Sequence, residues 1–490
     1  MLKTATPESV GISSKAISAF LNDLHESRFN MHSVLVLRHG KLIFEAYREP
    51  YDKDRKHRMF SISKTFTALA AGLLIDEGKL SLCDKVVSFF PEYCPEPVHP
   101  LLASATIYDM LTMQDPHDHT THGYDIKANW LESWFLTPPD HPPGTIFQYN
   151  TTSTNLIASI IERITGQKMI DYMYPRLLTP LGFSEGCFCG ETPDGDSFGG
   201  SAVCCTPRDL TKLARFVMDE GVHEGKQLIN RDFILNLRSN LIGTDLMGIP
   251  VEGMFGYGYF TWHLRNNGFA FFGIHGQFAI GFPDKGLLVV TTGNTTDNYA
   301  NENDILFSQF LDRVFYHLYP ALSNDPLPEN ETALKELDQL SELPHILVKG
   351  SASSSTAGKI NGREYKLHPN KSGWKTVRFE FNDDIGKIYY ENRRGNKEIV
   401  FGMKHAVPFR FPEEPNKNDI ADLPHDTYTN AGWSDERTLI VSVYNITAGY
   451  MHLTAVFNED EVTLAIRPFE GYRGDYGGYM YGKIITASEI

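Results

Sequence analysis

The spacing of hydrophobic residues changes once along the chain, and this change limits the possible folds more than any other feature. Up to about residue 320, apolar residues recur with helical spacing in some segments and alternate in others. From about residue 355 only short alternating runs remain, separated by Asn, Asp and Gly. Between them, a charged stretch is followed by GSASSSTAG (350–358), which is typical of a linker. The sequence therefore predicts an α+β domain over 1–320, a connecting helix and linker over 321–354, and a smaller all-β domain, either a sandwich or a barrel, over 355–490.

Several segments of the first domain carry signals for regular elements. A Ser cap or a terminal Gly accompanies helical spacing in four of them, and we expect helices over 13–27, 61–78, 153–166 and 207–221. Alternation and apolar runs predict strands over 31–49, with a turn at His39-Gly40, and over 256–263 and 270–292.

Charge and composition exclude some classes of function. The 490 residues include 45 Lys+Arg and 61 Asp+Glu, which gives a net charge of −16. Such a chain, without a basic run, is not expected to bind nucleic acid or an anionic membrane surface. No apolar stretch approaches the roughly 18 residues of a membrane-spanning helix, and residues 1–8 do not resemble a signal peptide. We therefore expect a cytoplasmic protein, with a trimmed leader as the alternative.

All six cysteines lie between residues 83 and 205. An even number permits disulfides, but a protein that is not secreted favours reduced thiols. Cys187-x-Cys189 and Cys204-Cys205 offer four zinc ligands, although their spacing matches no common zinc module. We interpret them as small buried apolar side chains and predict no metal site.

The sharpest local motif is a serine followed three residues later by a lysine. Ser61 and Lys64 share one face of the expected helix, so the amine can reach the hydroxyl. The helix start favours developing negative charge at Ser61, and apolar neighbours lower the pKa of Lys64. This pattern is typical of serine enzymes that transfer acyl groups. A second copy, Ser372 to Lys375, lies at the edge of an expected strand where the side chains would not meet, so we set it aside.

Stretches on both sides of this motif follow in a defined order. They are TPESVGIS (6–13), VLVLRHGKLIFEAY (34–47), FSISKTFTALAAGLLIDEGKLSLCDKVVSFFPEY (60–93), IYDMLTMQD (107–115), PPGTIFQYNTTSTNLIASIIERITG (142–166), PLGF (180–183) and CCTPRDLTKLARFVMDEG (204–221). Over residues 5–318 the chain resembles the penicillin-recognising serine hydrolases, which include class C β-lactamases, DD-peptidases, esterases and D-aminopeptidases. The resemblance implies a β-lactamase/transpeptidase-like fold, with an antiparallel sheet flanked by helices and a helical subdomain, and catalysis without a metal or cofactor.

The resemblance also implies roles for a second motif, Tyr-x-Asn in the family. Tyr149 takes the tyrosine position, where its phenol would relay protons to and from Ser61 beside Lys64. The third position is Thr151, which keeps a hydroxyl but loses the amide that orients the lysine and grips the substrate in relatives. Thr151 is therefore expected to bind substrate less strongly than the family asparagine.

The third family motif, Lys/His-x-Gly, is also altered. With Gly276 and Gln277 as anchors, Ile274 fills the Lys/His position and His275 the middle one. Neighbouring side chains on a strand point to opposite faces, so either Ile274 or His275 faces the cleft; we favour His275, with Gly276, as substrate-binding. The backbone N–H groups of Ser61 and Gln277 would form the oxyanion hole, which needs no particular side chain.

A run of aspartates and histidines, DPHDHTTH (115–122), precedes the second motif. Metal binding, cleft lining and an ordinary solvated loop all remain open for this run.

The sequence as a whole predicts a serine hydrolase that forms an acyl-enzyme with an ester, small amide or peptide substrate. A β-lactamase or a DD-carboxypeptidase (penicillin-binding protein) is the first alternative, and a ligand binder or sensor that does not turn over is the second. The all-β domain could cover the cleft, bind a ligand or mediate self-association, which would make a homo-oligomer.

Overall fold

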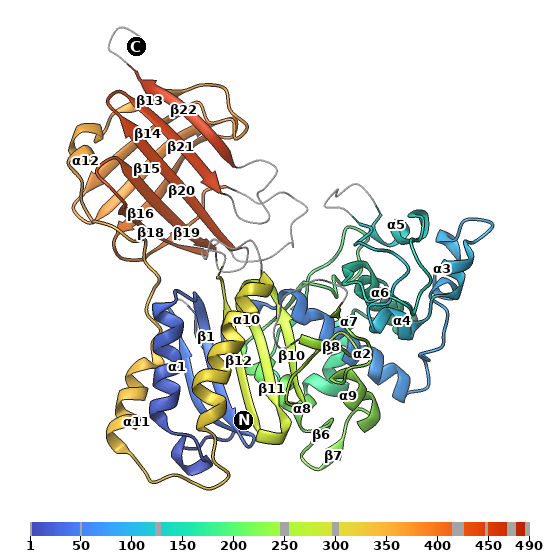
Figure 1. Ribbon diagram of the computed structural model, residues 1–490. Helices are drawn as coiled ribbons and strands as arrows, with labels where there is room; N and C mark the ends of the chain where they lie inside the picture. Colours follow the sequence, from blue (N-terminus) through green and yellow to red (C-terminus); the bar gives the residue numbers. More distant parts are fainter. Residues whose placement is uncertain are drawn as a thin grey trace. The chain divides into compact units, whose positions relative to one another are not determined.

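A computed structural model describes residues 2–49, 51–122, 129–245, 254–295, 303–413, 426–445, 449–467 and 477–485 (Figure 1). Its contacts group the chain into two compact units, Met1–Pro344 and His345–Ile490. The connecting helix expected after residue 320 corresponds to α11 (Glu331–Asp338), which packs on α1 (Ser14–Glu26) within the first unit. The domain boundaries at 320 and 355 stay a proposal.

The first unit is built on one antiparallel sheet of seven strands, in the order β2-β1-β12-β11-β10-β9-β8. The strands are β1 (Met31–Arg38), β2 (Lys41–Tyr47), β8 (Met254–Tyr257), β9 (Trp262–Leu264), β10 (Gly268–Gly273), β11 (Gln277–Phe282) and β12 (Leu287–Gly293). The hairpin predicted at His39-Gly40 joins β1 to β2, and β1 also pairs with β12. Residues 256–263, expected as one strand, instead contain the turn between β8 and β9.

Helices cover both faces of this sheet. Helix α8 (Pro207–Met218) packs against β11 and β12, and α1 and α10 (Asn303–Arg313) lie over the opposite face (Figure 1). Predicted end signals are confirmed: the Ser13 side chain caps α1, and Gly166 ends α6 (Thr151–Thr165) in the left-handed conformation. The helix expected over 61–78 is α2 (Ser63–Asp76), and it is preceded by a separate 3₁₀ turn, Phe60–Ile62.

Shorter elements complete the first unit. The remaining helices are α3 (Pro100–Ser104), α4 (Ile107–Leu111), α5 (Trp130–Leu136), α7 (Met169–Met173) and α9 (Arg231–Leu237). One small sheet consists of β3 (His57–Arg58), β4 (Phe188–Cys189) and β5 (Val203–Cys205). A second consists of β6 (Val222–His223) and β7 (Lys226–Gln227).

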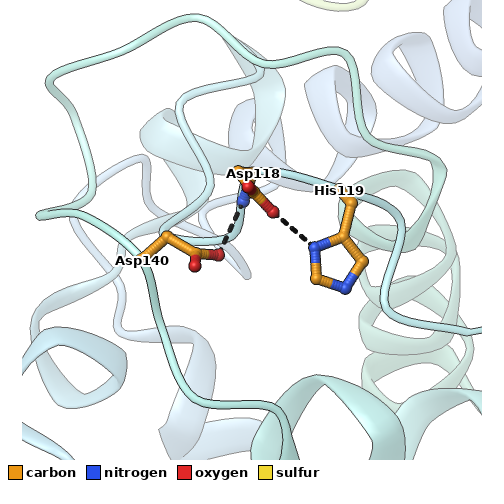
Figure 2. Close-up of side chains that lie close together, drawn as sticks. All are labelled: Asp118, His119 and Asp140. Atoms are coloured by element: carbon orange, nitrogen blue, oxygen red, sulfur yellow. Dashed lines mark hydrogen bonds and ion pairs between the residues drawn. The ribbon is translucent and has the colours of Figure 1, made fainter.

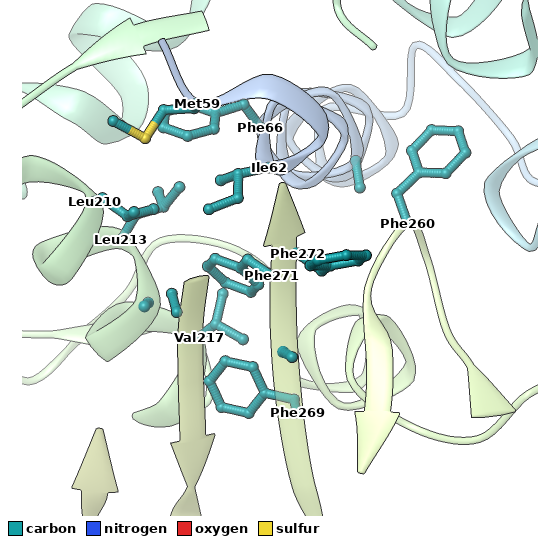
Figure 3. Close-up of a cluster of buried hydrophobic side chains, with 14 of the residues drawn as sticks. Met59, Ile62, Phe66, Leu210, Leu213, Val217, Phe260, Phe269, Phe271 and Phe272 are labelled. Atoms are coloured by element: carbon teal, nitrogen blue, oxygen red, sulfur yellow. The ribbon is translucent and has the colours of Figure 1, made fainter. Parts of the chain in front are cut away.

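An apolar core lies beneath the start of α2. Met59, Ile62 and Phe66 meet Phe271 of β10 and Leu213 of α8 in one buried cluster (Figure 3). Their burial fixes the chain on both sides of Ser61, because close-packed side chains leave little room for the backbone to shift.

The second unit is a closed β-barrel with helix α12 (Ser355–Ile360). Its strands are β13 (Glu364–Leu367), β14 (Thr376–Asn382), β15 (Ile385–Asn392), β16 (Gly395–Met403), β17 (Val407–Arg410), β18 (Asp426–Trp433), β19 (Thr438–Asn445), β20 (Gly449–Asn458), β21 (Glu461–Arg467) and β22 (Gly478–Ile484). The strands follow the order β16-β15-β14-β13-β22-β21-β20-β19-β18, and each pairs antiparallel with the next. A parallel pairing of β16 with β18 closes this ring of nine described strands. Of the two predicted architectures, the barrel is the one observed.

None of the helices in the described ranges has the length and apolar composition needed to cross a membrane.

Candidate active site

Ser61 lies in a turn with an unusual backbone conformation. Phe60, directly before it, has φ +47°, in the left-handed region that bulky residues rarely adopt. The Phe60 side chain is buried between the Arg58 guanidinium, 4.4 Å from its ring centroid, and the His275 ring at 5.0 Å. Such strain persists only where surrounding packing enforces it, and it concentrates at functional sites.

Lys64 is buried and its amine contacts three oxygen atoms. Its side chain is in the first turn of α2, and Nζ lies 3.3 Å from Ser61 Oγ, 3.3 Å from Thr151 Oγ1 and 2.8 Å from the Gly200 carbonyl oxygen. Only 1% of Lys64 is exposed, and burial lowers its pKa to about 7. The lysine is therefore poised to lose and regain a proton near neutral pH.

Tyr149 lies against this amine. Lys64 Nζ is 4.9 Å from the centroid of the Tyr149 ring. The ring stacks on Trp262, with centroids 5.9 Å apart and planes 16° apart, and meets Tyr257 edge-on at 6.4 Å. Two aromatic side chains from β8 and β9 thus hold the Tyr149 ring beside the lysine.

Thr151 lies next to the Lys64 amine at the start of α6. It is the first residue of α6, capped by the Asn150 side chain, which accepts a hydrogen bond from Thr152 N. This cap directs the Thr151 hydroxyl toward Lys64, so the shorter side chain still contacts the amine.

The Gly200 carbonyl is a contact that the sequence did not reveal. A Cβ at Gly200 would lie 2.5 Å from Thr151 Cγ2, so a side chain here would displace α6. Gly200 N also donates to Asn155 Oδ1 on α6 at 3.2 Å. The adjacent glycines at 199 and 200 were the available signal, because paired glycines indicate close backbone approach.

The third motif forms a turn and not part of a strand. Ile274, His275 and Gly276 connect β10 to β11, and His275 has φ +70°. The alternation argument for these two side chains was therefore wrong: both are partly exposed, because in a turn neighbouring side chains need not point to opposite faces. The turn lies beside the residue that precedes Ser61, since the ring of His275 contacts Phe60.

Two contacts fix this turn against the site. A Cβ at Gly273 would lie 2.5 Å from the Met59 carbonyl oxygen, so only glycine allows β10 to approach the chain before Ser61 this closely. The buried Gln277 side chain donates to the Ile274 and Gly293 carbonyls and accepts from Gly293 N. Gln277 is thereby locked at the start of β11 by side-chain contacts as well as by the sheet.

The aspartate–histidine run separates into parts with different environments. Asp115 and His117 are buried and paired at 2.9 Å, and Asp115 also accepts from Trp134 Nε1 and Ser153 Oγ. Burial lowers the pKa of His117, but the hydrogen bond and charge of Asp115 outweigh it and the net pKa is raised. This pair supports the packing of α5 against α6.

Asp118, His119 and Asp140 come together at the surface (Figure 2). Their nearest ligand atoms lie within 4.8 Å of one another, and all three side chains are exposed. Exposed acidic groups gather in many proteins without an ion, so this cluster carries no metal proposal.

The cysteines bring no comparable group together. Cys187, Cys204 and Cys205 are buried, and burial raises the pKa of each thiol, that of Cys204 to about 12. Within the described ranges they do not place three possible metal ligands within 4.8 Å of one another. The zinc interpretation therefore gains no support.

The second Ser-x-x-Lys copy is not a catalytic pair. Lys375 pairs with Glu391 at 2.6 Å, whereas Ser372 Oγ contacts the Gly477 carbonyl at 3.4 Å. The two side chains are engaged with different partners in the barrel unit.

Comparisons with known proteins agree with this geometry. The 6-aminohexanoate-dimer hydrolase of Paenarthrobacter ureafaciens is 28% identical over 56% of this chain and 75% of its own length. Esterase EstB of Burkholderia gladioli is 26% identical over 38% of this chain and 54% of its own, so the chain spans about half the length of that relative. A penicillin-binding protein homologue from Caulobacter crescentus shares the fold with a TM-score of 0.50 and 14% identity, over 62% of this chain and 97% of that one.

A family model completes the comparison. It is described as Beta-lactamase and matches residues 23–308, which include α2, α6 and the strands from β1 to β12. The first unit therefore has the β-lactamase/transpeptidase-like fold, and the chain belongs to the beta-lactamase family.

Proposed function

We propose that this protein is a serine hydrolase that cleaves an ester, small amide or peptide bond through an acyl-enzyme on Ser61. The observation that carries the proposal is the buried Lys64 amine, 3.3 Å from Ser61 Oγ, whose pKa is lowered to about 7. Relatives named as an aminohexanoate-dimer hydrolase and an esterase support the same bond classes.

The three contacts of Lys64 support one direction for the first proton transfer. The Gly200 carbonyl can only accept, so one N–H of a neutral amine is committed to it. The second N–H points to Thr151 Oγ1, which leaves the nitrogen lone pair for the hydroxyl proton of Ser61. Lys64 then takes this proton as Ser61 Oγ bonds to the substrate carbonyl carbon.

The next steps use groups that surround Ser61. The backbone N–H groups of Ser61 and Gln277 are proposed to stabilise the negative oxygen of the tetrahedral intermediate. Tyr149, held against Lys64, gives its phenol proton to the leaving group as the bond between that group and the carbonyl carbon breaks, and Lys64 passes the Ser61 proton to the phenolate. The acyl group stays on Ser61. Water then adds to the acyl carbon and gives a proton to the same pair. The pair returns this proton to Ser61 Oγ as the bond between Oγ and the acyl carbon breaks, which releases the acid and restores Ser61.

The altered motifs favour esters and small amides over β-lactams. Thr151 has no amide group, and Ile274 supplies no positive charge where relatives have lysine or histidine. A carboxylated β-lactam would therefore lose two polar contacts, whereas an uncharged ester needs neither.

The experiment compares hydrolysis of 4-nitrophenyl acetate by the native protein, Ser61→Ala, Lys64→Ala and Tyr149→Phe. We expect Ser61→Ala to lose activity to background and the other two variants to lose at least about a hundredfold in kcat. Ser372→Ala is the matched control, because Ser372 belongs to the other Ser-x-x-Lys copy. Equal rates for native protein and Ser61→Ala would contradict the proposal and favour a binder that does not turn over.

Mass spectrometry provides the second readout. The native protein should gain the mass of the acyl group on the peptide that contains Ser61. A chromogenic cephalosporin tested in parallel should be turned over far more slowly than the ester, and rapid turnover would reverse the order of substrates.

A further inference from the structure

Residues 120–122 are hydrogen-bonded to the start of α6. Thr151 N donates to Thr120 Oγ1 at 3.1 Å, and Thr121 N donates to Thr152 Oγ1 at 3.0 Å. The hydroxyl of Thr151 faces Lys64, so these contacts place the end of the aspartate–histidine run beside the proposed catalytic amine.

His122 is held at this place by two contacts. Its Nδ1 lies 3.0 Å from Thr152 Oγ1, and its ring stacks on Trp130, with centroids 4.1 Å apart and planes 14° apart. Burial, together with the charge of Lys64, lowers the pKa of His122 to about 4. The imidazole is therefore neutral near pH 7 and close enough to Lys64 to sense its charge.

A chain of hydroxyls favours a hydrogen on Nδ1 of the His122 ring. Ser133 Oγ donates to the Trp130 carbonyl at 2.6 Å, so it accepts from Thr121 Oγ1, 2.9 Å away. Thr152 Oγ1 has one hydrogen and two neighbours that could accept it, Thr121 Oγ1 at 3.2 Å and His122 Nδ1 at 3.0 Å. When Thr121 accepts this hydrogen, Thr152 accepts from His122 Nδ1. In this arrangement every hydroxyl both donates and accepts, and Nε2 of His122 keeps its lone pair.

That lone pair is not used within the described part of the chain. Among the described residues Nε2 has no hydrogen-bond partner, and the His122 side chain is partly exposed. A neutral imidazole nitrogen with a lone pair accepts a hydrogen bond from an N–H or O–H group and repels a carbonyl oxygen.

We propose that His122 is a substrate-binding residue whose Nε2 accepts a hydrogen bond from an N–H of the substrate near the cleaved carbonyl. This inference rests on the proposed function and names its substrate class: acylamino esters and peptide-like amides, in preference to compounds without that N–H. His122 thereby supplies a polar contact at the start of α6, where Thr151 lacks the family amide.

The first test needs only the native protein and a pair of esters. The probes are the 4-nitrophenyl esters of N-methoxycarbonylglycine and of its N-methylated counterpart, which lacks the N–H. After correction for their rates without enzyme, we expect kcat/KM to be about tenfold higher for the N–H ester. Equal values would overturn the proposal.

The second test changes His122. His122→Phe keeps a ring to stack on Trp130 but has no acceptor, so the ratio of kcat/KM for the two esters should fall from about ten to about one. His122→Gln restores an acceptor and should recover part of the preference. His119→Phe is the control, because His119 belongs to the same run and its side chain is exposed.

The outcomes separate the two proposals. An equal loss for both esters in His122→Phe would mean a purely structural role and would overturn the inference. Hydrolysis of both esters by Ser61→Ala at the native rate would instead remove the proposed function itself. If His122→Phe does not fold, the ester pair with native protein still decides.

Discussion

The proposed mechanism needs a buried Lys64 that gains and loses a proton, so the pKa of this lysine should appear in the pH dependence of the rate. A lysine in water titrates near 10.5, whereas burial lowers the pKa of Lys64 to about 7. The active form is the neutral amine, so kcat/KM for an ester should rise with pH through about 7 and level off above it. A profile from about pH 5 to 9 would check this, and a midpoint near the ordinary lysine value would contradict it.

The Thr151 hydroxyl offers a second test on a single residue. Thr151→Val keeps the shape but removes the oxygen that contacts Lys64 at 3.3 Å. The amine then loses one hydrogen-bond partner, and we expect kcat/KM to fall about tenfold. Thr151→Ser keeps the hydroxyl and should stay within about threefold of the native value. Native activity in Thr151→Val would show that the hydroxyl is not needed.

The turn before α2 stores strain that packing compensates. Phe60 has φ +47°, which glycine adopts without cost, and its side chain is buried. Phe60→Ala keeps the strain and loses the packing, while Phe60→Gly loses the packing but also the strain. We expect Phe60→Gly to be more stable than Phe60→Ala by about 1 kcal/mol. Urea unfolding of both variants measures this, and the reverse order would mean that the turn is not strained.

The helices were predictable from sequence because their end signals are local. Each helix end is marked by a residue within one turn of it: Ser13 at the start of α1, Gly166 at the end of α6 and Gly221 after α8. The turn at 274–276 was not predicted, because the apolar residues on both sides of it gave the pattern of a continuous strand. Apolar spacing alone does not show where a hairpin turns.

The sequence identified only those parts of the site that depend on a particular side chain. Ser61, Lys64, Tyr149 and Thr151 were identified as candidates from the motifs, and the structure places the other three next to the Lys64 amine. The Gly200 carbonyl could not be found this way, because every residue has a carbonyl and this one is 136 positions from Lys64 in the chain. Such contacts depend on the fold and not on a motif.

Each unit has its own hydrophobic core, which predicts independent folding. The core of the first unit draws on residues up to Leu337, and the core of the second begins at Ile360. We therefore expect fragments 1–344 and 345–490 each to unfold cooperatively, and fragment 1–344 to keep its Ser61-dependent esterase activity within about threefold. Calorimetry and ester hydrolysis check both points. An unfolded first fragment would show that the second unit is needed for its stability.

The pairing of β1 with β12 has a consequence for how the protein is made. Val34 lies opposite Thr291, so the N-terminal hairpin pairs with a strand that the ribosome supplies more than 250 residues later. Contacts this distant in sequence slow folding, because a large loop must close before the strands gain from meeting. During synthesis one edge of β1 is therefore expected to stay unpaired until β12 has been made. A chaperone would contribute most at this stage.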